Sequence, residues 1–161
     1  MQTQGTTSGQ FIQRINIIFY IQLTFIIAFN AIAFVGKNDS SDPALSNIML
    51  YVLTGMCAIL VPASLFIYKM LVARAGSDTT LGNKLTKYMT ATIIRMACLE
   101  LPGFFAAGVI LMTGNLMALL GAILVVTLLV FNRPSIVQLL QDIPFTPEEK
   151  DKLNNPNAVV M

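Results

Sequence analysis

The sequence contains no histidine, and this absence excludes several kinds of functional site. Histidine is the side chain that most often acts as a general base, ligates haem or binds zinc. Only two cysteines are present, and both Cys57 and Cys98 fall inside apolar stretches without a paired ligand spacing. Free cysteine in such surroundings packs as a small hydrophobe. We therefore expect no metal site, no cofactor and no catalytic residues, and a protein that is not an enzyme.

Charged residues are also scarce in this chain of 161 residues. Only 11% of the residues are charged and 55% are hydrophobic, whereas soluble domains have about 25% charged and about 45–50% apolar residues. The net charge is +2 and the basic residues form no cluster, which argues against nucleic-acid binding. Together with a mean hydropathy of +0.72, this composition predicts an integral membrane protein surrounded by a lipid bilayer.

Four apolar runs follow one another along the chain, at residues 15–35, 48–72, 90–112 and 116–131. A helix needs about 20 residues to cross a hydrocarbon core of about 30 Å, so the first three runs are long enough and the fourth is short. Gly114 and Asn115 tolerate the backbone angles of a tight reversal, which makes the last two runs a hairpin. We predict an all-α bundle of four transmembrane helices over residues 13–132, in two hairpins, after a disordered polar segment at 1–12.

Basic residues mark which ends of these helices face the cytoplasm, where Lys and Arg are favoured. Arg14 precedes the first run, Arg133 follows the fourth, and four more flank the loop between the second and third: Lys69, Arg74, Lys84 and Lys87. This placement predicts that both termini are cytoplasmic, and a bacterial inner membrane fits the lack of eukaryotic targeting features. The first run also imitates a cleavable signal peptide with Ala31-Ile32-Ala33 as its small-residue site, but Asn16 and Gln22 interrupt its apolar run.

Glu100 lies near the middle of the third run, roughly 15 Å from its start. A charged carboxylate at that depth costs at least about 2.5–3.5 kcal/mol, so we expect Glu100 to be neutral or closely partnered. Helical spacing puts it on one face with Gly103 and Ala107, a pair of small residues that lets another backbone approach. Pro102 removes a backbone donor and loosens the helix there. We therefore expect Glu100 to face a neighbouring helix and not lipid.

Polar residues of the first run lie at the depth of Glu100. Thr24 is the expected hydrogen-bond partner, and Gln22 is at similar depth on another face. Glu100, Pro102, Thr24 and Gln22 thus form a candidate ion or proton site, with a neutral acid that joins helices as the structural alternative. Arg95 is about 140° around the helix axis from Glu100 and near the cytoplasmic side, so we expect it to snorkel to the interface in preference to pairing with Glu100.

Small residues on the last two helices indicate close packing. Gly103 and Ala107 are joined by Ala118 and Ala122 in the fourth run. Small faces of this kind support either a tight monomeric bundle or self-association, and the sequence alone leaves both open.

The tail at residues 133–161 is expected to contain two short helices. Apolar residues recur with the period of one helix face at Ile136, Leu139, Leu140 and Ile143. Thr146 and Glu149 make a capping box around Pro147, which predicts a helix at about 147–153. The residues from Asn154 onward are expected to fray. The amphipathic tail either lies on the membrane surface or docks onto a cytoplasmic partner.

These features leave two main functions. The first is a non-enzymatic accessory or structural subunit of a membrane complex, which we favour, and the second is a small proton- or ion-coupled transporter that uses Glu100. The midplane glutamate resembles that of the proteolipid rotor subunits of rotary ATPases, but their glycine-rich helices are absent here. It also resembles the carboxylate of small multidrug transporters, which are shorter and carry it in the first helix. Neither resemblance assigns a role to a residue of this chain.

Overall fold

The computed structural model describes residues 5–37 and 42–160, and over these ranges the chain is helical without strands. Its six helices are α1 (Ser8–Val35), α2 (Pro43–Gly76), α3 (Leu81–Thr113), α4 (Ala118–Phe131), α5 (Ile136–Asp142) and α6 (Pro147–Asn154). The predicted all-α class is confirmed. The helices α1 to α3 contain the first three apolar runs. The helices α2 and α3 extend beyond both ends of their runs, and α1 extends beyond the start of its run, because the neighbouring polar residues continue each helix.

Three of these helices are long and apolar enough to cross a membrane. With 28, 34 and 33 residues, α1, α2 and α3 measure about 40–50 Å at about 1.5 Å per residue, more than the hydrocarbon core requires. The 14 residues of α4 give only about 21 Å. A bend of 79° separates α4 from α5. By length and composition, the described chain therefore has three candidate spans, or four if α4 and α5 count as one.

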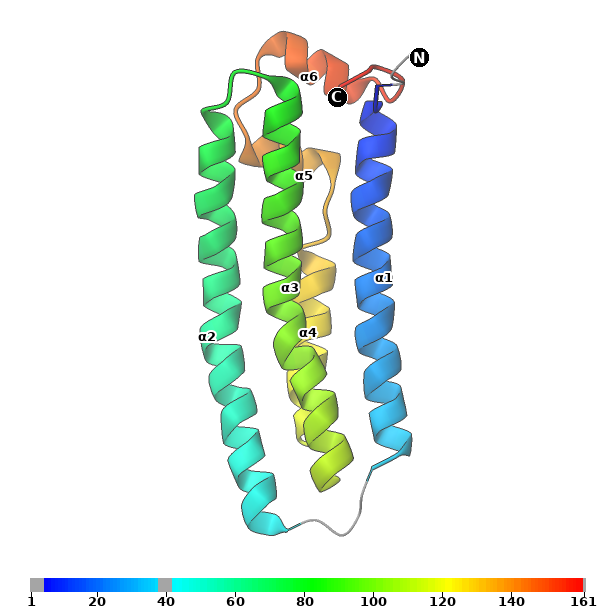
Figure 1. The fold of residues 1–161 in the computed structure, drawn as a ribbon, viewed down its shortest axis with the longest axis vertical. Coiled ribbons are helices and arrows are strands. Elements are labelled where there is room, and N and C mark those ends of the chain that lie inside the picture. The colour runs from blue at the N-terminus through cyan, green and yellow to red at the C-terminus, as the bar shows by residue number, and fades with distance from the viewer. Residues whose placement is uncertain (1–4, 38–41, 161) are drawn as a thin grey trace.

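The four longer helices run alongside one another, and α3 is central because it packs against α2, α4 and α1 (Figure 1). Both chain ends lie at the same end of this bundle, together with α5 and α6 (Figure 1). We call it the tail end. The opposite end, where α1 stops at Val35 and α2 begins at Pro43, is called the loop end.

The start of α1 is ordered by the end of the tail. The amides of Ser8 and Gly9 donate to the carbonyls of Ala158 (3.0 Å) and Pro156 (3.1 Å), and a capping box closes the same turn. The first amides of a helix lack partners within it, so the tail supplies the missing acceptors. The structure thus departs from the expected disorder at residues 6–12, since Thr6 and Thr7 also pair with the end of the tail, and from the expected fraying after Asn154. Residues 1–4 of the predicted disordered segment lie outside the described residues.

The tail packs onto the chain's own helices. Leu139 of α5 and Leu153 of α6 are fully buried, in one cluster with Tyr68, Leu85 and Tyr88 of the bundle. The capping box of α6 is present as predicted. The apolar face of the tail therefore covers the tail end of α2 and α3. Both expected roles, lying on the membrane surface and binding a separate partner, required this face to be free, and in the structure it is not.

Candidate functional site

Arg95 is buried where α3 meets the linker between α4 and α5, with only 2% of its surface exposed. Its Nη2 donates to the carbonyl oxygen of Asn132 at 2.9 Å, and its Nη1 lies 3.4 Å from the side-chain oxygen of the same residue. The expected snorkelling is therefore not what the structure has. The last carbonyls of α4 lack partners within the helix, and a positive charge is favourable at a helix C-terminus, so the guanidinium turns inward to that end.

Tyr68 of α2 lies between Arg95 and the tail. The guanidinium carbon of Arg95 is 3.9 Å from the centroid of the Tyr68 ring, and the Tyr68 hydroxyl donates to the carboxylate of Asp142 at the end of α5. The ring of Tyr88 meets that of Tyr68 edge to face, with centroids 6.4 Å apart. We call Tyr68, Tyr88, Arg95, Asn132 and Asp142 the Arg95 cluster. It joins α2, α3, the linker and α5 beneath the tail.

Some hydrogen-bonding groups in and beside the Arg95 cluster have no partner among the described residues. The Tyr88 hydroxyl, the nearby Thr92 hydroxyl and Nε of Arg95 are buried without a hydrogen-bond partner among the described residues. Gln138 of α5 adds one contact, because its amide in the orientation that suits its neighbours accepts from Nη1 of Arg95 at 3.2 Å. Unpaired buried polar atoms destabilise a fold, so these three atoms offset part of the stability that the paired contacts contribute.

A second polar contact fixes the tail to α3. Nζ of Lys84, which is buried, donates to Oε2 of Glu149 at 2.8 Å and to the carbonyl of Pro144 at 3.3 Å. The backbone amide of Thr146 donates to the same carboxylate oxygen at 2.9 Å. Burial by itself raises the pKa of Glu149, but the hydrogen bonds from Lys84 and Thr146 together outweigh it and hold that pKa below its ordinary value.

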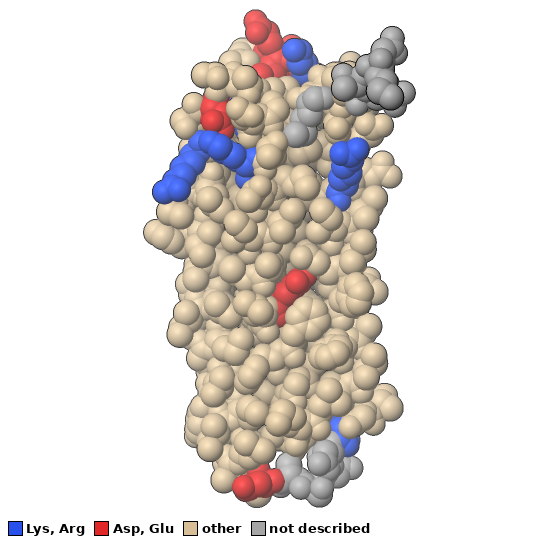
Figure 2. All heavy atoms as spheres, in the orientation of Figure 1, with Lys and Arg blue, Asp and Glu red and all other residues tan. Residues whose placement is uncertain are grey.

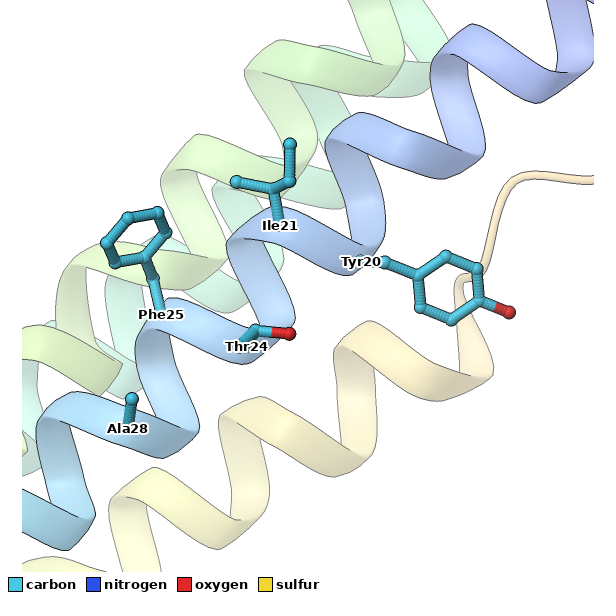
Figure 3. A pocket seen from close by; sticks show the side chains of 5 residues that line it. All are labelled: Tyr20, Ile21, Thr24, Phe25 and Ala28. Atoms are coloured by element: carbon cyan, nitrogen blue, oxygen red, sulfur yellow. The ribbon is translucent and has the colours of Figure 1, made fainter.

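Glu100 is half-buried in α3. Its Oε1 is buried without a hydrogen bond from any residue that the structure describes, and Oε1 of Gln22 is unpaired in the same way. Thr24 does not meet Glu100. It lies exposed on the outward face of α1, in a shallow apolar hollow of about 340 Å³ that it shares with Tyr20, Ile21, Phe25 and Ala28 (Figure 3). The predicted candidate site is thus not assembled around Thr24.

Asn30 makes the polar contact between α1 and α3 that was expected of Thr24. Its Nδ2 donates to the carbonyl oxygens of Ile26 (3.0 Å) and Gly103 (3.2 Å), and the residue is only 7% exposed. The signal for this contact in the sequence is an asparagine inside an apolar run. Asn30 contacts Gly103, and Glu100 lies three residues before Gly103 in α3. Glu100 is therefore level with about Ile27 of α1, and not with Thr24 as the sequence predicted.

Gly103 lies where three helices meet. A Cβ atom there would be 3.2 Å from Val125 of α4 and 3.4 Å from Ile26 of α1, so the glycine allows both neighbours to approach. The other small residues predicted to pack, Ala107, Ala118 and Ala122, are all buried in one cluster nearer the loop end. Pro102 is buried within a helix that continues through it.

The centre of the bundle beside Glu100 is apolar. Ile26, Met96, Leu99, Val125 and Leu129 are all almost fully buried in one cluster. Glu100 directly follows Leu99 in the chain but lies to the side of this cluster, since it is only half-buried. The carboxylate is therefore at the flank of the bundle and not in a polar interior.

No protein-family model, curated protein or solved structure matches this chain. Two groups stand out by their chemistry. The Arg95 cluster holds the tail and the end of α4 in place, whereas Oε1 of Glu100 is buried without a hydrogen bond from the residues that the structure describes.

Proposed function

We propose that the chain is a non-enzymatic accessory subunit that crosses the membrane four times and packs there against other membrane components. The fourth crossing consists of α4 and the linker at residues 132–135. Irregular backbone at membrane depth is tolerated where surrounding protein supplies its hydrogen bonds, and Arg95 donates to the carbonyl of Asn132 in this linker. This contact supports a fourth crossing, because α4 alone is shorter than the hydrocarbon core.

The proposed orientation has both termini in the cytoplasm, as in a bacterial inner membrane. Arg14, Arg74, Lys84 and Lys87 lie toward the tail end of α1, α2 and α3. On the face shown in Figure 2, Lys and Arg lie mainly toward that end. Below them is a long stretch of surface without charge, apart from acidic surface at mid-height. Since Lys and Arg favour the cytoplasmic side, this distribution supports a cytoplasmic tail end.

The apolar centre beside Glu100 is the observation that carries the accessory role. A transporter needs polar groups that lead from one side of the membrane to the other. At the depth of Glu100 the described centre is filled by Ile26, Leu99 and Val125, each at most 1% exposed. The outward surface, by contrast, is rich in large apolar side chains such as Phe25 at 63% and Phe66 at 70% exposed. An outward apolar surface suits lateral packing in a membrane.

Ion flux tests this proposal against the transporter alternative. The purified protein and its Glu100→Gln variant are reconstituted into liposomes, and proton and monovalent-cation fluxes are followed with pH- and potential-sensitive dyes. We expect both proteins to match protein-free liposomes. A flux carried by the wild type and lost in Glu100→Gln would overturn the accessory role and favour the transporter.

Cysteine labelling tests the four crossings. Ser77→Cys at the tail end and Ala44→Cys at the loop end are each introduced into a Cys57→Ser, Cys98→Ser background. Both positions are exposed in the structure. In intact cells, a membrane-impermeant maleimide should label position 44 and leave position 77 unlabelled until the membrane is opened. A third reporter, Asn157→Cys near the end of the tail, should behave like position 77, and labelling in intact cells would contradict the proposed topology.

A further inference from the structure

A hollow of about 310 Å³ lies between the tail ends of α2 and α3, and two basic side chains line it. Its lining residues are Leu71 and Arg74 of α2 and Lys87 and Thr90 of α3. Both Arg74 and Lys87 are exposed, so a molecule from outside the chain can reach their charged groups. We call this hollow the α2–α3 groove.

The α2–α3 groove has a net positive charge. Nζ of Lys87 lies 2.8 Å from the carboxylate of Asp78, yet 47% of the Lys87 side chain is exposed. An ammonium group has three N–H donors, so this ion pair leaves Lys87 able to contact a second anion. Arg74 makes no ion pair within the described residues. Two cations and one carboxylate leave a charge of +1, which is complementary to a single phosphodiester group.

The surface along the groove changes from basic to apolar with depth. The helix α2 runs toward the tail end and α3 runs away from it (Figure 1). Arg74 and Lys87 therefore lie nearest the tail end, and the other two lining residues lie one turn deeper. One further turn along the same sides of the two helices are Ile67 and Ile94, both half-exposed. A phospholipid has the same order of groups, because its charged phosphate precedes its apolar acyl chains, whereas inorganic phosphate has no apolar part.

We propose that the α2–α3 groove binds the headgroup of an anionic phospholipid, with the phosphate between Arg74 and Lys87 and the acyl chains along Ile67 and Ile94. Basic pockets between transmembrane helices on the cytoplasmic side bind such headgroups, and the planar fork of a guanidinium matches the geometry of a phosphate. A zwitterionic lipid fits less well, because its ammonium group adds a third cation to the groove. This inference rests on the orientation proposed above, which places the tail end at the cytoplasmic membrane surface.

Lipid titration tests the kind of ligand. The purified protein in a mild non-ionic detergent is titrated with phosphatidylglycerol or with phosphatidylcholine of the same acyl chains, and bound lipid is counted by native mass spectrometry. We expect phosphatidylglycerol to bind at least several-fold more tightly, and inorganic phosphate at equal concentration to leave it bound. Equal binding of the two lipids, or displacement of phosphatidylglycerol by inorganic phosphate, would overturn the proposal.

Substitution of Arg74 tests the place of binding. Arg74→Gln removes one cation without breaking a described ion pair, and we expect the affinity for phosphatidylglycerol to fall about fivefold, the effect of one basic residue on an anionic lipid. Arg74→Lys keeps the charge and should retain more of the affinity. Lys69→Gln is the matched control, because Lys69 is an exposed cation of the same helix about 140° around its axis from Arg74. An equal loss in Arg74→Gln and Lys69→Gln would overturn the groove as the binding site.

The two proposals fail in different ways. If cysteine labelling supports the topology while phosphatidylglycerol binds no better than phosphatidylcholine, only the lipid site is wrong. If labelling places residues 77 and 157 on opposite sides of the membrane, the proposed four-span arrangement is wrong whatever the lipid titrations give.

Discussion

The guanidinium carbon of Arg95 lies 3.9 Å from the centroid of the Tyr68 ring, beneath a tail that covers both residues. A buried cation stacked on an aromatic ring is stabilised by the ring's negative face. Here the same cation also donates to the linker after α4. Arg95 therefore connects the packing of α2 and α3 to the position of the tail, and its removal should affect both.

Replacing Arg95 with leucine should destabilise the protein by about 2–3 kcal/mol, because the partly buried carbonyl of Asn132 loses a charged donor. Thermal unfolding in detergent, followed by a thiol-reactive dye that reports exposure of the two cysteines, measures the loss. Arg133→Leu is the control, since Arg133 is exposed and its guanidinium carbon lies 5.2 Å from the centroid of the Tyr20 ring. An equal effect of the two substitutions would contradict the role given to Arg95.

Tyr68→Phe and Tyr88→Phe form a matched pair. Both remove one hydroxyl from buried rings in contact, but only the Tyr68 hydroxyl donates to Asp142, whereas the Tyr88 hydroxyl has no partner among the described residues. We expect Tyr68→Phe to lower the free energy of unfolding by about 1.5–3 kcal/mol and Tyr88→Phe to have little effect. In a double-mutant cycle, Tyr68→Phe should cost little once Asp142→Asn is present, and additive effects would argue against the contact.

The tail should loosen in acid because the pKa of Glu149 is held below its ordinary value. A carboxyl group whose pKa is lower in the folded state contributes stability above the unfolded pKa, about 4.3, and loses it as the pH falls through the folded pKa. Proteolysis of the tail should therefore accelerate below about pH 4. Glu149→Gln should be cleaved faster at neutral pH and show a weaker acid response. Glu148→Gln, an exposed neighbour, should behave like the wild type.

The substitutions Gly103→Ala and Gly108→Ala add a methyl group at a tightly packed position of α3 and at one with free space around it. Alanine favours a helix over glycine by up to about 1 kcal/mol, so Gly108→Ala, with nothing within 4 Å of its new Cβ, should be neutral or stabilising. At Gly103 the new Cβ would press on Val125 at 3.2 Å, which should cancel this gain or reverse it. Thermal unfolding of both variants decides the matter, and a Gly103→Ala variant more stable than Gly108→Ala would contradict the packing described here.

The sequence predicted the parts of the fold that depend on local patterns. Long apolar runs located α1, α2 and α3, and the capping box of Thr146 and Glu149 located α6. The direction of Arg95 was missed, because helical periodicity gives an angle around one axis and does not tell which distant segment covers that face. The Thr24 partnership failed for a related reason, since Thr24 lies on the outward face of α1 and Asn30 makes the polar contact with α3.

The amides of Ser8 and Gly9 pair with the carbonyls of Ala158 and Pro156. The start of α1 can therefore be completed only after the end of the tail has been synthesised. The first turn of α1 is synthesised before its acceptors, which lie about 150 residues later in the chain. Until then that turn can be capped only by Thr7 and by water. The first turn of α1 is thus completed only after the segment at 156–158 has been made, so two segments far apart in the chain are joined in one late step of folding.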